Sequence, residues 1–193
     1  MSDVNTDDAP LSASKHTAAA IDTATESLIE KRGDTMVGRA VTINRPRAEL
    51  FAYFRDFTNL AHFMENVERI DVIDAKRSHW VVKAPGGRTV EWDALITDEV
   101  EGEYLAWASQ PGADVANSGR IDFRDAGARG TVVTATLLYD PPYGVVGRLI
   151  AKLFQREPAI QARRDLRRFK QLMETGEVAT AARTRKQFEE EMA

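Results

Sequence analysis

Residues Arg88–Asp98, with the sequence Arg-Thr-Val-Glu-Trp-Asp-Ala-Leu-Ile-Thr-Asp, alternate largely between apolar and polar side chains. In an extended chain, one face of this segment carries Val90, Trp92, Ala94 and Ile96. Such alternation is typical of a β-strand with one face against a core and the other toward solvent. The segment therefore predicts a half-buried strand of an antiparallel sheet.

Further short strands are predicted on both sides of this segment. Their predicted ranges are 36–44, 67–73, 78–84, 104–109, 119–124 and 131–139. Turn-forming residues separate neighbouring strands, among them Pro-Gly-Gly at 85–87 and Glu-Gly at 101–102. Short strands joined by tight turns predict a seven-stranded antiparallel meander.

Two short helices are predicted between the first and second strands. Apolar residues recur at helical spacing over residues 48–57 and again at 60–64. Pro46 suits the first turn of the first helix, and Asn59 is the predicted cap of the second.

A long C-terminal helix is predicted after Pro141-Pro142, so the expected fold class is α+β. Apolar stripes at helical spacing cover residues 146–154 and 162–173. Pro158 lies between the stripes and is expected to kink the helix or to start a new one. Gly176 is the predicted end of the helix.

The predicted elements fall in one domain, residues 34–178. Residues 1–33 are polar, with six acidic against three basic side chains and no Phe, Trp or Tyr. This composition predicts a flexible leader with a short helix. Residues 179–193 form a predicted charged tail.

The composition excludes several classes of protein. The 193 residues include no cysteine, which excludes disulfides, thiol nucleophiles and cysteine-ligated zinc. The net charge of −4 argues against general nucleic-acid binding, and no apolar run approaches the roughly 18–20 residues of a membrane span. The N-terminus lacks the basic and apolar order of a secretion signal, so we predict a cytoplasmic protein.

Several segments resemble a known superfamily. They are Thr-Ile-Asn-Arg-Pro at 42–46, Phe-Arg-Asp-Phe at 54–57, Ser-His-Trp at 78–80, Thr-Val-Glu-Trp-Asp-Ala at 89–94, Tyr-Asp-Pro-Pro at 139–142 and Asp-Leu-Arg-Arg-Phe-Lys-Gln-Leu-Met-Glu-Thr-Gly-Glu at 165–177. They are similar to the START-like (SRPBCC) superfamily, and within it to the bacterial polyketide cyclase/dehydrase (coenzyme Q-binding-like) group. The resemblance covers about residues 36–178.

This resemblance implies a helix-grip fold, in which a curved sheet wraps around the long C-terminal helix and leaves a cavity between them. Superfamily members bind lipids, sterols, polyketides or quinones there, and some catalyse cyclisation, dehydration or hydrolysis. The residues expected to line the cavity are Val90, Trp92, Ala94, Ile96, Leu105, Trp107, Ile121, Phe123, Leu149, Leu153, Phe154, Ala162, Leu166 and Phe169. The alternative for these residues is a filled core.

A few polar residues are candidates for catalysis. Glu91 and Asp93 share one face of their strand, with Cα atoms about 7 Å apart, which suits acid–base work if that face is buried. Because Trp92 is expected to face inward, the alternative is that both carboxylates face solvent. His62 is a candidate general base at the cavity mouth and Tyr139 a candidate donor, each with packing as its alternative. No metal site is predicted.

The C-terminal helix carries a local excess of basic residues. These are Arg148, Lys152, Arg156, Arg163, Arg164, Arg167, Arg168 and Lys170. The simplest interpretation is a solvated face whose charges pair with acidic loops. Peripheral membrane contact is an alternative, and contact with nucleic acid or the ribosome is a less favoured one.

We predict that the chain binds or carries an apolar or amphipathic small molecule, of the lipid or isoprenoid quinone class, without a cofactor. The phosphate-binding glycine loop, the Gly-x-Ser-x-Gly elbow, His-Glu-x-x-His and the dinucleotide fingerprint are all absent. One alternative is a cyclase or dehydratase acting on a polyketide-like substrate through the catalytic candidates above. Another is a stress or interaction module with a vestigial cavity, whose functional surfaces are the leader and the basic helix.

Overall fold

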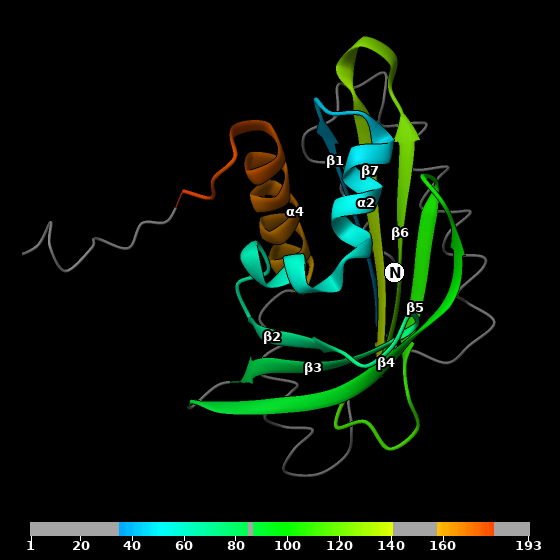
Figure 1. Ribbon diagram of the computed structural model, residues 1–193. Helices are drawn as coiled ribbons and strands as arrows, with labels where there is room; N and C mark the ends of the chain where they lie inside the picture. Colours follow the sequence, from blue (N-terminus) through cyan, green and yellow to red (C-terminus); the bar gives the residue numbers. More distant parts are fainter. Residues whose placement is uncertain (1–34, 85–86, 141–157, 180–193) are drawn as a thin grey trace, which may run out of the picture.

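The computed structural model describes residues 35–84, 87–140 and 158–179 (Figure 1). Its strands are β1 (Thr35–Ile43), β2 (Val67–Val72), β3 (Arg77–Ala84), β4 (Arg88–Val100), β5 (Tyr104–Ser109), β6 (Ala116–Asp125) and β7 (Thr131–Asp140). Its helices are α2 (Arg47–Arg55), the short 3-10 helices η1 (Phe57–His62) and η2 (Gly127–Arg129), and α4 (Pro158–Thr175). The predicted leader at 1–33 and nearly all of the predicted tail lie outside the described residues.

The strands form a seven-stranded antiparallel sheet in the order β1-β7-β6-β5-β4-β3-β2. Strands β2 to β7 are a meander of neighbours, and β1 closes the other edge by pairing with β7. Helix α4 packs on the sheet, and α2 and η1 lie between β1 and β2 in the chain. This arrangement confirms the predicted helix-grip α+β fold.

The sheet is strongly curved. In Figure 1, β2, β3 and β4 lie across one end of α4, whereas β6 and β7 run alongside it. The register between β4 and β5 shifts between Ile96 and Asp98, and that between β2 and β3 shifts between Val67 and Arg69. An extra residue in one strand bends it and increases the local twist. These irregularities therefore help the sheet to curl around the helix.

One predicted cap is wrong. The side chain of Asp56 caps η1, with Oδ1 accepting a hydrogen bond from the Thr58 backbone nitrogen at 3.1 Å. Asn59 lies inside η1 and instead donates from Nδ2 to the Tyr53 carbonyl oxygen at 3.1 Å. The 3-10 helix begins at Phe57, directly after Asp56, so Asp56 and not Asn59 holds the position from which a side chain reaches the first free amides.

The end of α4 agrees with the prediction. The helix ends at Thr175, and Gly176 follows with a φ of +83° while its nitrogen donates to the Leu172 carbonyl oxygen at 2.8 Å. Glycine adopts this left-handed conformation without steric cost, which makes it a common helix terminator. The predicted stripe at 146–154 lies outside the described residues.

An aromatic cluster joins the helices to the sheet. The Phe63 and Phe169 rings stack with centroids 4.8 Å apart, and Phe54 meets Phe169 edge-on at 6.0 Å. On the sheet side, Phe123 of β6 meets Phe51 at 5.7 Å and Phe54 at 6.1 Å. Buried aromatic pairs of this kind add to the large apolar area that each ring removes from water.

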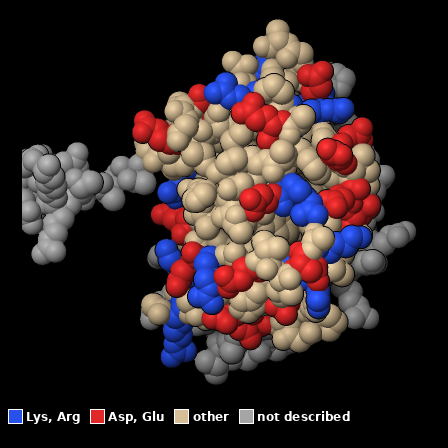
Figure 2. Space-filling view, viewed as in Figure 1, with Lys and Arg blue, Asp and Glu red and all other residues tan. Residues whose placement is uncertain are grey.

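Charged side chains of both signs are interspersed over the face of the molecule shown in Figure 2. Among the described residues, several charged side chains form ion pairs, such as Arg55 with Glu99 at 2.6 Å and Arg77 with Asp74 at 2.7 Å. Three hydrogen bonds, two from backbone nitrogens and one from Arg77, lower the pKa of Asp74 to about 2. Isolated surface ion pairs add little to stability. The face in Figure 2 shows no broad region of one charge sign.

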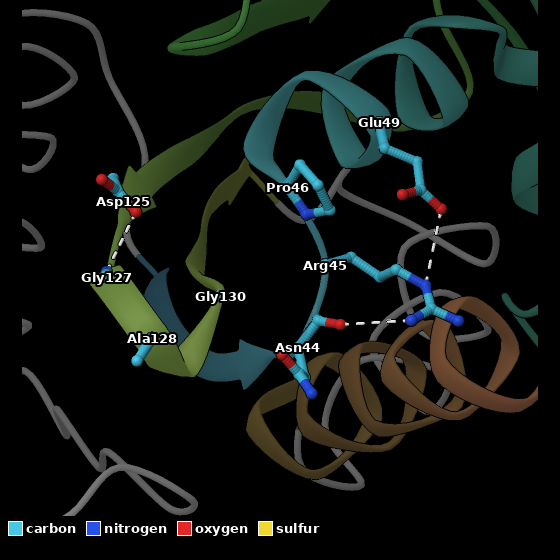
Figure 3. A pocket seen from close by; sticks show the side chains of 8 residues that line it. All are labelled: Asn44, Arg45, Pro46, Glu49, Asp125, Gly127, Ala128 and Gly130. Atoms are coloured by element: carbon cyan, nitrogen blue, oxygen red, sulfur yellow. Dashed lines mark hydrogen bonds and ion pairs between the residues drawn. The ribbon is translucent and has the colours of Figure 1, made fainter.

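The turn between β6 and β7 depends on one glycine. Gly127 is the first residue of η2 and Gly130 directly follows the helix, and both have positive φ, +61° and +90° (Figure 3). A Cβ at Gly127 would meet nothing within 4 Å, whereas a Cβ at Gly130 would lie 2.2 Å from the carbonyl oxygen of Ile43. The hydroxyl of Thr131 donates to the Arg45 carbonyl oxygen at 2.8 Å beside this contact. Gly130 therefore lets the turn pack against the end of β1.

We expect Gly130→Ala to destabilise the protein by about 3 kcal/mol, because both the backbone conformation and the contact with Ile43 become unfavourable. The matched control, Gly127→Ala, meets only the conformational cost of about 1 kcal/mol. Urea unfolding of the two variants measures the difference, and equal losses would contradict the role given to the Ile43 contact.

Candidate functional site

A cavity of about 190 Å³ lies between the concave face of the sheet and α4. Its wall combines residues of α2, η1, the sheet and α4, and it is mostly apolar. The residues that line it are Phe54, Phe57, Leu60, Phe63, Met64, Asn66, Val67, Trp80, Val82, Trp92, Trp107, Asn117, Ser118, Ile121, Ala135, Leu137, Leu138, Gln161, Ala162, Asp165 and Leu166.

The three tryptophans of the chain all line this cavity. Trp80 and Trp92 are opposite each other on β3 and β4, and their rings stack with centroids 6.1 Å apart and planes 10° apart. Trp80 donates from Nε1 to Ser78 Oγ at 2.9 Å, which satisfies its polar group. Flat aromatic faces make this wall suited to a planar ligand ring.

Trp107 takes its place in the wall because β6 has a glycine opposite it. Trp107 of β5 pairs with Gly119 of β6, and a Cβ at position 119 would lie 2.3 Å from Cζ2 of the indole. The ring therefore occupies the space that any larger residue at 119 would fill. The Trp107 indole can lie in this position because Gly119 has no side chain.

Asp165 of α4 places a carboxyl group in this apolar wall. The residue is 9% exposed, and its Oδ1 accepts hydrogen bonds from Gln161 Nε2 at 2.9 Å and from the Glu65 nitrogen at 3.4 Å. Burial raises its pKa to about 7, against the opposing effects of these hydrogen bonds and of the Arg168 charge. A carboxyl group with a pKa near neutrality can both donate and accept a proton, which suits ligand orientation or acid–base work.

The remaining polar groups of the wall come from the sheet side and from the loop after η1. Asn117 and Ser118 lie on β6, and Asn66 follows Glu65. Asn117 donates from Nδ2 to the Val115 carbonyl oxygen at 3.1 Å, and its nitrogen donates to Ser109 Oγ at 3.0 Å. These bonds shape the end of β6.

The residues predicted to line the cavity divide into three groups. Trp92, Trp107, Ile121, Ala162 and Leu166 lie in its wall. Those that lie in the packed core instead are Val90, Ala94, Ile96, Leu105, Phe123 and Phe169. Leu149, Leu153 and Phe154 lie outside the described residues.

The structure does not bring the catalytic candidates together in this cavity. Glu91 and Asp93 flank His79, with Asp93 Oδ1 2.8 Å from His79 Nδ1 and Glu91 Oε2 3.5 Å from His79 Nε2. Their side chains are 49% and 45% exposed, on the outer face of the sheet. His62 is exposed and lies 3.2 Å from the Tyr53 hydroxyl, while the Tyr139 side chain lies outside the described part of the chain.

The residues that sequence reasoning missed include Asp165 and Gln161. Asp165 falls on the apolar stripe of its helix, between Ala162 on one side and Leu166 and Phe169 on the other. A single carboxylate within an apolar helix stripe is unusual, and this feature of the sequence could have identified Asp165 as a candidate site residue. Across the described ranges, no three side chains of the His, Asp and Glu types are arranged to hold a metal ion.

Several predicted basic residues pair with acidic ones. Arg164 Nη1 and Arg168 Nη1 each lie 3.4 Å from Glu65 Oε2, and Lys170 pairs with Glu174 at 3.3 Å. Arg148, Lys152 and Arg156 lie outside the described residues, and Arg163 and Arg167 lie on α4. Within the part of the chain that the structure describes, no helix is long and apolar enough to cross a membrane.

A second hollow of about 600 Å³ lies on the outside of the molecule, between the start of α2 and the β6–β7 turn (Figure 3). Its polar groups are used locally: Arg45 pairs with Glu49 at 3.5 Å, and the Gly127 nitrogen donates to Asp125 Oδ1 at 3.0 Å. This hollow also offers a ligand less apolar surface than the cavity between the sheet and α4 does.

The pKa of Asp165 makes stability depend on pH. Its folded-state pKa of about 7 exceeds the unfolded value of 3.8, so the folded protein binds the extra proton between these values. The contribution of Asp165 to the free energy of unfolding is therefore largest below pH 4. It falls as the pH rises and levels off above pH 7. We expect Asp165→Asn to remove this decline, which amounts to about 4 kcal/mol. Denaturant unfolding across this range tests it, and parallel pH profiles for both proteins would contradict it.

Comparisons with known proteins agree with this geometry. The family model described as polyketide cyclase/dehydrase and lipid transport matches residues 35–174. An uncharacterized 17.2 kDa protein from the melC2-rnhH intergenic region of Streptomyces lincolnensis is 27% identical over 139 residues, which cover 72% of this chain and 89% of that protein.

Solved structures show the same fold. DR_A0006 from Deinococcus radiodurans is 41% identical, with a TM-score of 0.61, over 74% of this chain and 99% of that chain. TTHA0849 from Thermus thermophilus is 25% identical, with a TM-score of 0.58, over 71% and 95%. The Zhui aromatase/cyclase from Streptomyces sp. R1128 shares the fold at 13% identity, with a TM-score of 0.59 over 75% and 99%. Because the family model spans nearly the whole described body, the chain belongs to the polyketide cyclase/dehydrase and lipid transport family of the START-like (SRPBCC) superfamily.

Proposed function

We propose that this chain binds an apolar or amphipathic small molecule of the isoprenoid quinone or lipid class, with a flat ring of that ligand inside the cavity. The family binds hydrophobic ligands or cyclises polyketides. The observation that carries the proposal is the apolar cavity between the sheet and α4, whose wall holds all three tryptophans.

The size of the cavity supports a ring. A dry apolar cavity of about 150 Å³ is enough to hold benzene. The cavity of about 190 Å³ between the sheet and α4 therefore accommodates one substituted six-membered ring. Within the proposed ligand class, this volume and the stacked Trp80–Trp92 pair favour a quinone ring over a saturated chain.

The positions of the other predicted groups favour binding over the alternatives. Glu91, Asp93 and His62 lie outside the cavity wall, so the acid–base groups proposed for a cyclase do not face the space where a ligand fits. Of the predicted basic face, Arg164, Arg168 and Lys170 pair with acidic neighbours, which weakens the case for a surface-only role.

The first experiment is native mass spectrometry of the gently purified full chain, followed by analysis of whatever small molecule it releases. The second is a titration with tetramethylbenzoquinone, a short-chain ubiquinone analogue, a fatty acid and an aromatic phenol, each followed by tryptophan fluorescence. Because all three indoles line the cavity, a bound ligand is expected to change the emission. If the purified chain carries nothing and none of the four probes binds, the proposal fails.

We expect Ala162→Phe to weaken ligand binding by about tenfold or more, because Ala162 lines the cavity and the larger side chain fills part of it. The matched control is Ala52→Phe, the same change at an exposed position of α2, which should leave the dissociation constant unchanged. Equal affinity in wild type and Ala162→Phe would place the ligand elsewhere.

A further inference from the structure

The carboxyl group of Asp165 lies in an otherwise apolar stripe of α4. Ala162, Leu166 and Phe169 are on the same side of the helix, and all of them are buried. Burying a carboxyl group without an ion partner costs free energy of folding. A role in ligand binding would account for that cost at Asp165. Asp165 also lines the cavity, which gives this group a place where a ligand can contact it.

The hydrogen bonds of Asp165 define which oxygen carries its proton. Gln161 Nε2 and the Glu65 nitrogen both donate to Oδ1. An oxygen that accepts two hydrogen bonds is poorly placed to carry the acid proton, so the neutral carboxyl carries it on Oδ2. The neutral form then has its O–H donor on Oδ2, in a residue that lines the apolar cavity.

The charged groups around Asp165 are engaged with one another. Arg168 on α4 faces it, but its Nη1 pairs with Glu65 Oε2, as does Nη1 of Arg164. The Glu65 charge disfavours ionisation of Asp165, while the Arg168 charge favours it. Burial outweighs the hydrogen bonds and the Arg168 charge that favour ionisation, so the pKa is about 7 and the neutral acid is present up to about that pH.

We infer that the Asp165 carboxyl donates a hydrogen bond from Oδ2 to a carbonyl oxygen on the ligand ring, and that it thereby selects carbonyl-bearing rings over plain hydrocarbons. This inference rests on the proposed function, because it names the group that hydrogen-bonds to the ligand inside the same cavity. The indoles hold the ring through its faces, and Gln161 keeps the carboxyl oriented through Oδ1. A ring that lacks the carbonyl leaves the buried donor without a partner, and that loss generates the selectivity.

The test compares two probes of similar shape, tetramethylbenzoquinone and tetramethylbenzene, which differ in the carbonyl groups. The full chain has no cysteine, so the quinone finds no thiol to alkylate. We expect the wild type to bind the quinone about tenfold more weakly above pH 8 than at pH 6, as Asp165 loses its proton. Binding of the hydrocarbon, which accepts no hydrogen bond, should change little over this range.

Three variants separate a ligand contact from a structural role. Asp165→Asn keeps a donor at every pH, so its quinone affinity should stay near the wild-type value at pH 6 and lose its pH dependence. Asp165→Leu should lose about tenfold in quinone affinity at pH 6 and retain hydrocarbon binding. Asp93→Asn makes the same chemical change on the outer face of β4 and should behave as the wild type.

The outcomes distinguish the inference from the proposal on which it rests. If both probes bind but the wild-type quinone affinity does not change with pH, or if Asp165→Asn shows the wild-type pH profile, the inference is overturned and cavity binding stands. If Asp165→Leu does not fold, the pH profiles of wild type and Asp165→Asn still decide the question. If neither probe binds at any pH, the inference fails, and the proposed function is then decided by the ligand released from the purified chain and by the other probes named above.

Discussion

The packing of Phe169 is the contact on which the rest of the structure depends. Its ring is fully buried, stacks on Phe63 and meets Phe54 edge-on, so it joins the second half of α4 to α2 and to the end of η1. Close packing there sets the distance between helix and sheet. The residues of α4 that line the cavity, from Gln161 to Leu166, lie toward the other end of the same helix. The packing of Phe169 therefore positions the part of α4 that lines the cavity.

The curvature of the sheet and the aromatic cluster together explain why a space remains. The register shift between Ile96 and Asp98 adds to the curvature of the sheet, while Phe169 packs α4 against Phe63. The Trp107 indole, which occupies the space above Gly119, and the Trp80–Trp92 stack line the remaining space without filling it. Asp165 departs from the apolar pattern of this wall, and such local conflicts are expected where a protein trades stability for function.

The prediction of the sheet succeeded because the side-chain period of a strand is visible in the sequence. In β4, Val90, Ala94 and Ile96 are buried and Glu91 is exposed, as the alternation predicted. The cap of η1 was mispredicted because Asp56 and Asn59 are both good capping residues, and only the start of the helix chooses between them. The family and its helix-grip fold were also predictable, since the matching motifs extend along the whole body.

For most strands and for the described helices, the sequence by itself determined which face turns inward, because that depends on periods of two and 3.6 residues along the chain. Strand β2 is the exception, because the register shift between Val67 and Arg69 interrupts its alternation. Only the tertiary structure decided which inward residues touch a cavity and which are packed solid. Phe169 and Leu166 share one stripe of α4 and both belong to the buried core, yet of these two Leu166 alone also lines the cavity. That difference depends on how the curved sheet diverges from the helix, a property of contacts between distant segments that no local pattern records.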